Sequence, residues 1–174
     1  MSTKMSTEKK FQDEEAVNKF KQLVKDVNVC MFTTVNDDQD LFSRPMVTTE
    51  VDDDGNAWFF TNEFSEKIHE ISKDNNVFLI YSNPKTNTYV NVKGTCTVVV
   101  DKARINQLWT PTLKAWFPEG SDDPKLCLLK VITEVAYYWN HSSSKMSVFF
   151  SMLKAIATKE KIDSGEVGKL NLSH

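Results

Sequence analysis

Six segments rich in β-branched and aromatic residues, separated by polar turn sequences, constrain this chain more than any other feature of its sequence. They span residues 27–35, 42–51, 57–61, 77–81, 88–101 and 126–139. Such residues pack well on a pleated surface, so each segment is predicted to form a β-strand. No regular series of helices separates the strands, which favours antiparallel pairing over a parallel α/β sheet.

Gly94 lies near the middle of the longest of these segments. A glycine inside a strand often marks a bulge or a sharp bend, and strands need such bends where a sheet curls into a barrel. The sequence therefore predicts a mainly β fold, a small six-stranded antiparallel β-barrel with flanking helices.

Helical periodicity is limited to four stretches. Apolar residues spaced three and four apart predict a helix over 13–26 and another over 147–158. A short helix is expected to begin at Ser65, a suitable N-cap residue. Residues 102–117 have a helical tendency that is broken at Pro111.

The 174 residues are enough for one ordinary domain. Polar residues at both ends predict a flexible N-terminal segment over 1–12 and a polar tail over 159–174, on either side of a single domain over 13–158. No apolar run reaches about 18 residues and the first residues contain no apolar leader, so neither a membrane span nor a secretion signal is expected.

Charge and cysteine content argue against several kinds of partner. The 21 Lys and Arg residues against 24 Asp and Glu residues give a net charge of −3, so no nucleic-acid surface is expected. The cysteines and histidines are scattered and form no Cys-x-x-Cys pair, so no metal site is expected. Cys30, Cys96 and Cys127 lie in apolar runs, and we interpret them as buried thiols of a cytoplasmic protein.

Residues 58–67 combine the end of a strand, a turn and the start of a helix at Ser65. The N–H groups at a helix start favour an anion. Hydroxyl groups from Thr61 and Ser65, with the charge of Lys67, would complete a pocket for one phosphate. A simple cap at Ser65 with a solvated Lys67 explains the same residues and is the commoner arrangement.

Arg44 and Pro45 lie side by side in the second predicted strand. Proline cannot donate to a ladder, and an interrupted ladder leaves neighbouring backbone groups available to a ligand. An edge strand with Arg44 in a surface ion pair is the alternative, and the residues alone favour it.

Three aromatic residues, Trp109, Trp116 and Phe117, gather in one connection rather than alternating along a strand. They offer an apolar surface for a ring-shaped ligand or a partner subunit. They could equally cap the barrel of their own chain, and the sequence does not decide between the two.

Taken in order, these motifs resemble the general stress protein group of the pyridoxamine 5′-phosphate oxidase-like flavin proteins. The resemblance spans residue 13 to about residue 140. The motifs that carry it are Ser43-Arg44-Pro45-Met46, Phe60-Thr61-Asn62 with Ser65 and Lys67, Asn91-Val92-Lys93-Gly94-Thr95, Leu108-Trp109, Ala115-Trp116-Phe117-Pro118, Asp122-Asp123-Pro124 and Tyr138-Trp139.

The resemblance implies an FMN-binding split β-barrel that works as a homodimer, with FMN at the subunit interface. Arg44 and Lys67 would face the FMN phosphate, with hydrogen bonds from Thr61 and Ser65. The ring would be approached by the following residues: Pro45, Met46, Val47 and Thr49 along its edge, Phe60, Tyr89, and Trp116 from the partner chain. Glu66, next to Lys67, is the twelfth residue predicted for the site. It departs from the oxidases, which carry a basic residue there, and an acidic neighbour weakens a site for a dianion.

The expected function is that of an FMN-binding, stress-related protein, with FMN-dependent oxidoreductase activity on an unknown substrate. The alternative is a non-enzymatic dimer that binds or sequesters flavin. The segment by which the oxidases grip pyridoxal phosphate has no counterpart in residues 169–174. Oxidation of vitamin B6 is therefore not implied.

Overall fold

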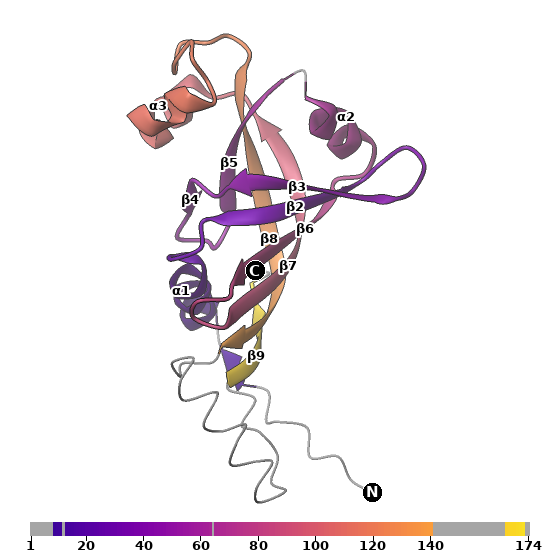
Figure 1. Ribbon diagram of the computed structural model, residues 1–174, viewed down its shortest axis with the longest axis vertical. Coiled ribbons are helices and arrows are strands. Elements are labelled where there is room, and N and C mark those ends of the chain that lie inside the picture. The colour runs from indigo at the N-terminus through magenta and orange to yellow at the C-terminus, as the bar shows by residue number, and fades with distance from the viewer. Residues whose placement is uncertain (1–8, 12, 64, 141–165, 173–174) are drawn as a thin grey trace, which may run out of the picture.

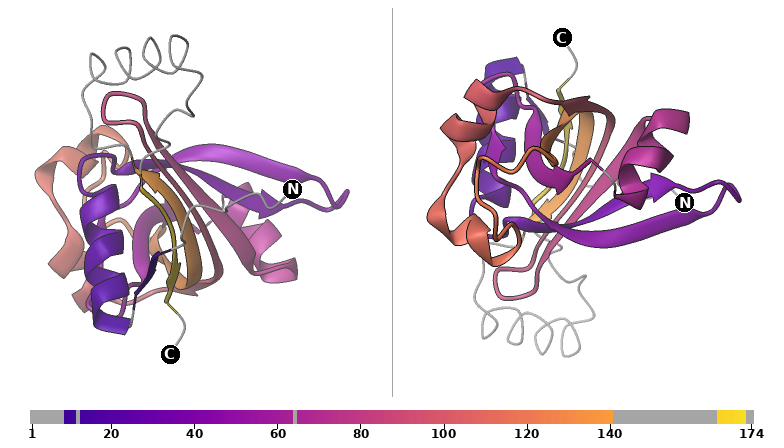
Figure 2. Two further views of the ribbon diagram at one scale, coloured as in Figure 1. Left: turned by 90° about the horizontal axis from the view of Figure 1, so that it is seen from below. Right: turned by 90° about the horizontal axis from the view of Figure 1, so that it is seen from above.

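A strongly curled sheet forms the centre of the molecule, with the helices arranged around it (Figures 1 and 2). The computed structural model describes residues 9–11, 13–63, 65–140 and 166–172. The strands are β1 (Lys9–Phe11), β2 (Val29–Val35), β3 (Leu41–Val47), β4 (Glu50–Val51), β5 (Ala57–Asn62), β6 (Asn76–Asn83), β7 (Thr88–Val99), β8 (Leu126–Asn140) and β9 (Glu166–Asn171). This architecture confirms the predicted mainly β class.

Strand β8 organises the sheet. The strand order is β1-β9-β8-β7-β6-β2-β3, with β5 attached to β8 and β4 attached to β5. One edge of β8 pairs with β7, while its other edge carries β5 along 126–131 and β9 along 135–140. The two branches that leave β8 give the sheet its curled, half-barrel form.

The irregularity predicted at Gly94 is present. The register between β7 and β8 shifts between Lys93 and Gly94. A Cβ atom at Gly94 would lie 2.5 Å from the carbonyl oxygen of Ile132, so a larger residue would force the two strands apart. A bulge of this kind increases local twist and helps the sheet to curl.

The structure differs from the prediction of six antiparallel strands. Residues 42–51 form two strands, β3 and β4, because the N–H groups of Thr48 and Thr49 donate to Asn28 and Trp58 rather than continuing one ladder. Strands β1 and β9 lie in the segments expected to be a flexible N-terminal segment and a polar tail. β9 joins the edge of β8, and β1 pairs with β9 in a parallel sense.

The helices agree with the sequence pattern where they can be compared. They are α1 (Asp13–Val24), α2 (Glu66–Lys73), α3 (Lys102–Leu108) and the 3-10 helix η1 (Pro111–Ala115). Ser65 is the N-cap residue of α2, and the break predicted at Pro111 separates α3 from η1. The helix predicted over 147–158 lies outside the described residues.

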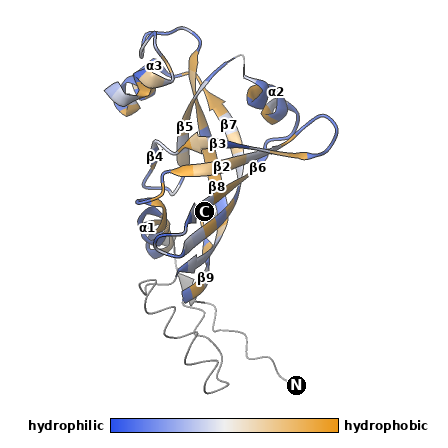
Figure 3. Ribbon diagram, in the orientation of Figure 1, coloured by the Kyte–Doolittle hydropathy of each residue, from blue (hydrophilic) through white to orange (hydrophobic). Residues whose placement is uncertain are grey.

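Two hydrophobic cores hold these elements together, and apolar residues concentrate along the central strands (Figure 3). The main core packs α1 inside the curled sheet, with Phe32 against Phe59 at 5.2 Å between ring centroids. The smaller core fixes α3 and η1 onto β5 and β8. Its buried members are Trp58, Phe60, Ile105, Leu108, Leu113, Leu126 and Leu128.

Gly168 lies where β9 packs closely against Tyr138 of β8. A Cβ atom there would lie 2.5 Å from the ring of Tyr138, which is fully buried and cannot swing away. We expect Gly168→Ala to lower the free energy of unfolding by about 1–3 kcal/mol in urea denaturation. Asn171→Ala, on the exposed side of the same strand, should change it little. Equal stabilities for the two variants would show that β9 tolerates the extra atom.

Candidate functional site

A pocket of about 330 Å³ opens between the end of β3, the end of β5, the start of α2 and η1. This volume falls at the lower end of the range of small-ligand sites, roughly 300–1,000 Å³. Nine of the twelve predicted site residues line it: Pro45, Met46, Val47, Thr49, Phe60, Thr61, Ser65, Lys67 and Trp116. Segments distant in the sequence therefore converge on one cavity, as the resemblance implies.

The polar end of the pocket is formed by Thr61, Ser65 and Lys67, called here the hydroxyl–lysine cluster. The Nζ atom of Lys67 donates to Thr61 Oγ1 at 3.0 Å, and Thr61 Oγ1 lies 3.3 Å from Ser65 Oγ. Although Ser65 occupies the N-cap position, its side chain accepts no hydrogen bond from the first turn of α2. The hydroxyl group of Ser65 thus faces Thr61 rather than capping the helix.

Lys67 is well suited to meet an anion. Burial lowers the pKa of its ammonium group, and the positive charge of Arg44 lowers it further. Among the described residues, no carboxylate forms an ion pair with Lys67. A phosphate placed beside Lys67 would offset both the desolvation and the repulsion by Arg44.

The other end of the pocket is apolar. Phe60 meets the ring of Trp109 edge-on at 5.8 Å between centroids, and Phe117 lies 6.2 Å from Phe60. Trp109 and Phe117 therefore pack onto the smaller core of their own chain. Trp116 differs, because it lines the pocket while 64% of its surface stays exposed.

Arg44 lies beside the pocket, not in its lining. Its Nη2 atom contacts Glu70 Oε2 at 2.6 Å, and its Nη1 atom donates to Thr34 Oγ1 at 2.8 Å. The guanidinium also stacks over the ring of Phe42, 4.6 Å from its centroid. The ion pair expected for an edge strand is thus present, but its side chains are only 16% and 10% exposed, so it is not a surface pair.

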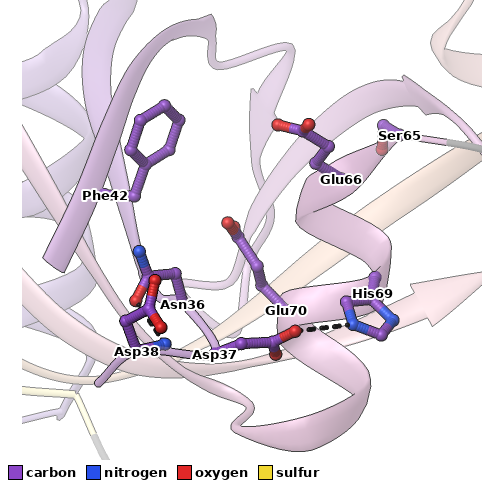
Figure 4. A pocket seen from close by; sticks show the side chains of 8 residues that line it. All are labelled: Asn36, Asp37, Asp38, Phe42, Ser65, Glu66, His69 and Glu70. Carbon is purple, nitrogen blue, oxygen red and sulfur yellow. Dashed lines mark hydrogen bonds and ion pairs between the residues drawn. The ribbon is translucent and has the colours of Figure 1, made fainter. Parts of the chain in front are cut away.

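Two other predicted residues lie apart from the pocket. Tyr89 projects from the exposed face of β7, opposite Trp139 of β8. Glu66 faces a second concavity on the other side of the start of α2, where Ser65 lines both pockets. Figure 4 shows this second pocket, in which Glu66 and Glu70 project from α2 and Phe42 faces them from β3. We call it the acidic pocket; its lining residues are Asn36, Asp37, Asp38, Phe42, Ser65, Glu66, His69 and Glu70.

Sequence reasoning missed several residues around these pockets. Asn62 and Leu113 complete the lining of the main pocket, and Glu70 with Thr34 holds Arg44. Phe117 also lines this pocket, as its place in the predicted aromatic surface allows. Asn62 adjoins a recognised motif and could have been included on that ground. The role of Glu70 could not be predicted from the sequence, because it is one of several polar residues in a short helix.

The described part of the chain contains neither a helix long and apolar enough to cross a bilayer nor a group of three metal-ligating side chains.

Known proteins are similar to this chain in sequence and in fold. Residues 15–163 match the family model described as pyridoxamine 5′-phosphate oxidase like. Protein bli-3 of Neurospora crassa is 28% identical over an alignment of 107 residues, and the match covers 56% of this chain and 51% of that protein. The matched region thus spans about half the length of this curated relative.

Two solved structures illustrate the similarity. A general stress FMN/FAD binding protein from Xanthomonas citri is 27% identical with a TM-score of 0.65, and the match covers 75% of this chain and 92% of the other. A protein related to general stress protein 26, from Clostridium acetobutylicum, is 23% identical with a TM-score of 0.65, covering 76% and 93%. The latter likeness supports the fold alone.

Proposed function

Because this chain belongs to the pyridoxamine 5′-phosphate oxidase-like family, we propose that it binds FMN in the pocket between β3, β5, α2 and η1 and acts as an FMN-dependent oxidoreductase. The observation that carries this proposal is the convergence of nine expected residues on one cavity. A flavin would supply the redox chemistry there, while the protein orients it and tunes its potential. A role in a stress response is part of the same proposal.

The two ends of the pocket fit the two ends of FMN. The hydroxyl–lysine cluster offers two hydroxyl groups and one ammonium group to a phosphate, and Phe60 with Trp116 offers apolar surface to a ring. Pro45, Met46 and Val47 would lie along the edge of the ring. Pro45 has no N–H group, and the N–H groups of Thr48 and Thr49 already donate within the chain. The polar end contains a single cation and so favours FMN, with one phosphate, over FAD.

Among the residues lining the pocket, Lys67 is the one that carries a titratable side chain. The described lining of this pocket therefore offers a substrate no carboxyl or imidazole group as a general acid or base. This observation favours a second candidate function, a non-enzymatic protein that binds or sequesters flavin. Turnover with a reduced nicotinamide cofactor separates the two functions.

A homodimer belongs to the proposal, and an exposed apolar surface beside the pocket supports it. We call this surface the outer apolar face; it comprises Val29, Met31, Ile80, Tyr89, Tyr137 and Trp139. Met31 pairs with Pro45 on one side and Ile80 on the other, so the face continues to the pocket edge. Exposed apolar patches of this kind usually mark interfaces, and a two-fold interface would use the same patch on both subunits.

Such a dimer would also account for two residues that stand apart from the enclosed part of the site. Tyr89 lies on the outer apolar face, and Trp116 is largely exposed at the mouth of the pocket. Contact with a second copy would bury both beside the flavin. The three cysteines are buried and form no disulfide bond, which supports a cytoplasmic location as part of the proposal.

The cofactor assignment predicts saturable binding of FMN with weaker binding of FAD. Flavin fluorescence titration of the purified protein should show saturation by FMN at or below tens of micromolar. Oxidation of NADH or NADPH by the loaded protein would favour the oxidoreductase, and stable binding without turnover would favour the non-enzymatic alternative. Absence of FMN binding, or tighter binding of FAD, would show that the site is wrongly assigned.

A further inference from the structure

Arg44 and Lys67 are close enough to repel one another, but Arg44 has an acidic partner and Lys67 has none among the described residues. The positive charge of Arg44 lowers the pKa of Lys67. Lys67 lines the main pocket, whereas the guanidinium of Arg44 is bound to Glu70 and Thr34. Glu70 itself lines the acidic pocket (Figure 4), and its ion pair with Arg44 leaves the guanidinium outside the lining of the main pocket.

The contacts that hold Arg44 form a closed network. Glu70 also contacts the hydroxyl group of Thr34, so Arg44, Thr34 and Glu70 are joined in a triangle. Phe42 stacks on the guanidinium from a further side. To reach a phosphate at the hydroxyl–lysine cluster, Arg44 would have to exchange a largely buried ion pair for a new one.

We propose that Glu70 is a positioning residue that competes with the flavin phosphate for Arg44. This inference rests on the proposed flavin function. The competition keeps FMN affinity below the level that Arg44 and Lys67 could together provide. Lys67 then provides the positive charge that is always present at the phosphate site. The contribution of Arg44 to FMN affinity depends on how easily its ion pair with Glu70 is broken. A flavin held in this way exchanges more easily than one held by both cations.

The Glu70→Gln substitution tests this arrangement, because glutamine keeps the size and one acceptor of the side chain while removing its charge. FMN and riboflavin are titrated against the wild-type protein, Glu70→Gln, Arg44→Gln and the double variant. We expect Glu70→Gln to bind FMN about tenfold more tightly, the order of one charge-assisted contact. Riboflavin has no phosphate, so its affinity should not change.

The double variant shows whether Glu70 acts through Arg44. In the Arg44→Gln background, Glu70→Gln should change FMN affinity by less than about threefold, because no guanidinium remains to be released. Asp38→Asn is the matched control, since it removes the same charge from the same acidic pocket at an exposed position that does not touch Arg44. It should alter FMN affinity by less than about threefold.

Thr34→Val provides a second approach if Glu70→Gln does not fold. It removes the hydrogen bonds of Thr34 with Arg44 and with Glu70 without changing charge, and this loosening of the network should raise FMN affinity by about two- to threefold. An unchanged or weaker FMN affinity in Glu70→Gln would overturn the proposal, as would an equal gain in the Arg44→Gln background. Failure of the wild-type protein to bind either flavin would instead overturn the flavin function on which the inference rests.

Discussion

Replacement of Lys67 by alanine is expected to weaken FMN binding by about ten- to hundredfold. The substitution removes one charge-assisted contact to the phosphate, worth about 1.5–3 kcal/mol. Lys67 is partly buried, carries no carboxylate partner among the described residues and donates to Thr61 at 3.0 Å, so its charge is available and its position is fixed. Fluorescence titration of the purified variant measures the effect directly.

Riboflavin supplies the internal control for this variant. Because riboflavin has no phosphate, it should bind the wild-type protein and Lys67→Ala equally. Lys73→Ala offers a matched surface control, because Lys73 lies at the end of the same helix and pairs with Asp37, away from the main pocket. FMN affinity that is the same in Lys67→Ala as in the wild-type protein would make Lys67 an ordinary surface lysine.

The second large effect is expected at the outer apolar face. Ile80 is 44% exposed and lies between Met31 and Asn91 in the sheet, near the middle of that face. We expect Ile80→Glu to weaken dimerisation at least about tenfold, because a desolvated carboxylate at the centre of an interface has no partner. Light scattering at micromolar concentration should report about twice the chain mass for the wild-type protein and a single mass for the variant.

FMN affinity should fall together with the dimer, since Tyr89 and Trp116 would lose the second copy that covers them. Val100→Glu is the matched control, because Val100 is exposed and apolar but lies outside the outer apolar face. A wild-type monomer that still binds FMN tightly would contradict both the interface and the proposed part played by Trp116.

Local sequence was sufficient to predict the strands that contain the core. Runs such as Val77–Tyr81 and the long segment around Gly94 have the composition and the interruption that the structure contains. Strand β9 is not predicted from the sequence because Gly168 and Lys169 interrupt its short apolar pattern. Its strand conformation depends instead on pairing with the edge of β8. Pairing with a distant strand leaves no signature in a polar segment.

The site shows the same division between local and distant information. Thr61, Ser65 and Lys67 fall within seven residues of one another, so their cluster could be predicted from one strand-to-helix junction. The attachment of Arg44 to Glu70 joins residues 26 positions apart and arises only when β3 packs beside α2. The sequence favoured an ion pair for Arg44 but contained nothing that named its partner or its burial.

The side chain of Ser65 turns toward Thr61 and leaves the first turn of α2 without a hydroxyl acceptor. Capping a helix start contributes about 0.5–2 kcal/mol, so α2 is less stable than it would be if Ser65 served as its cap. An anion at the hydroxyl–lysine cluster would take over this task, and ligand binding and helix stability would then be thermodynamically linked. Amide hydrogens in the first turn of α2 should accordingly exchange more slowly with solvent deuterium when FMN is present, whereas those of α1 should exchange at the same rate.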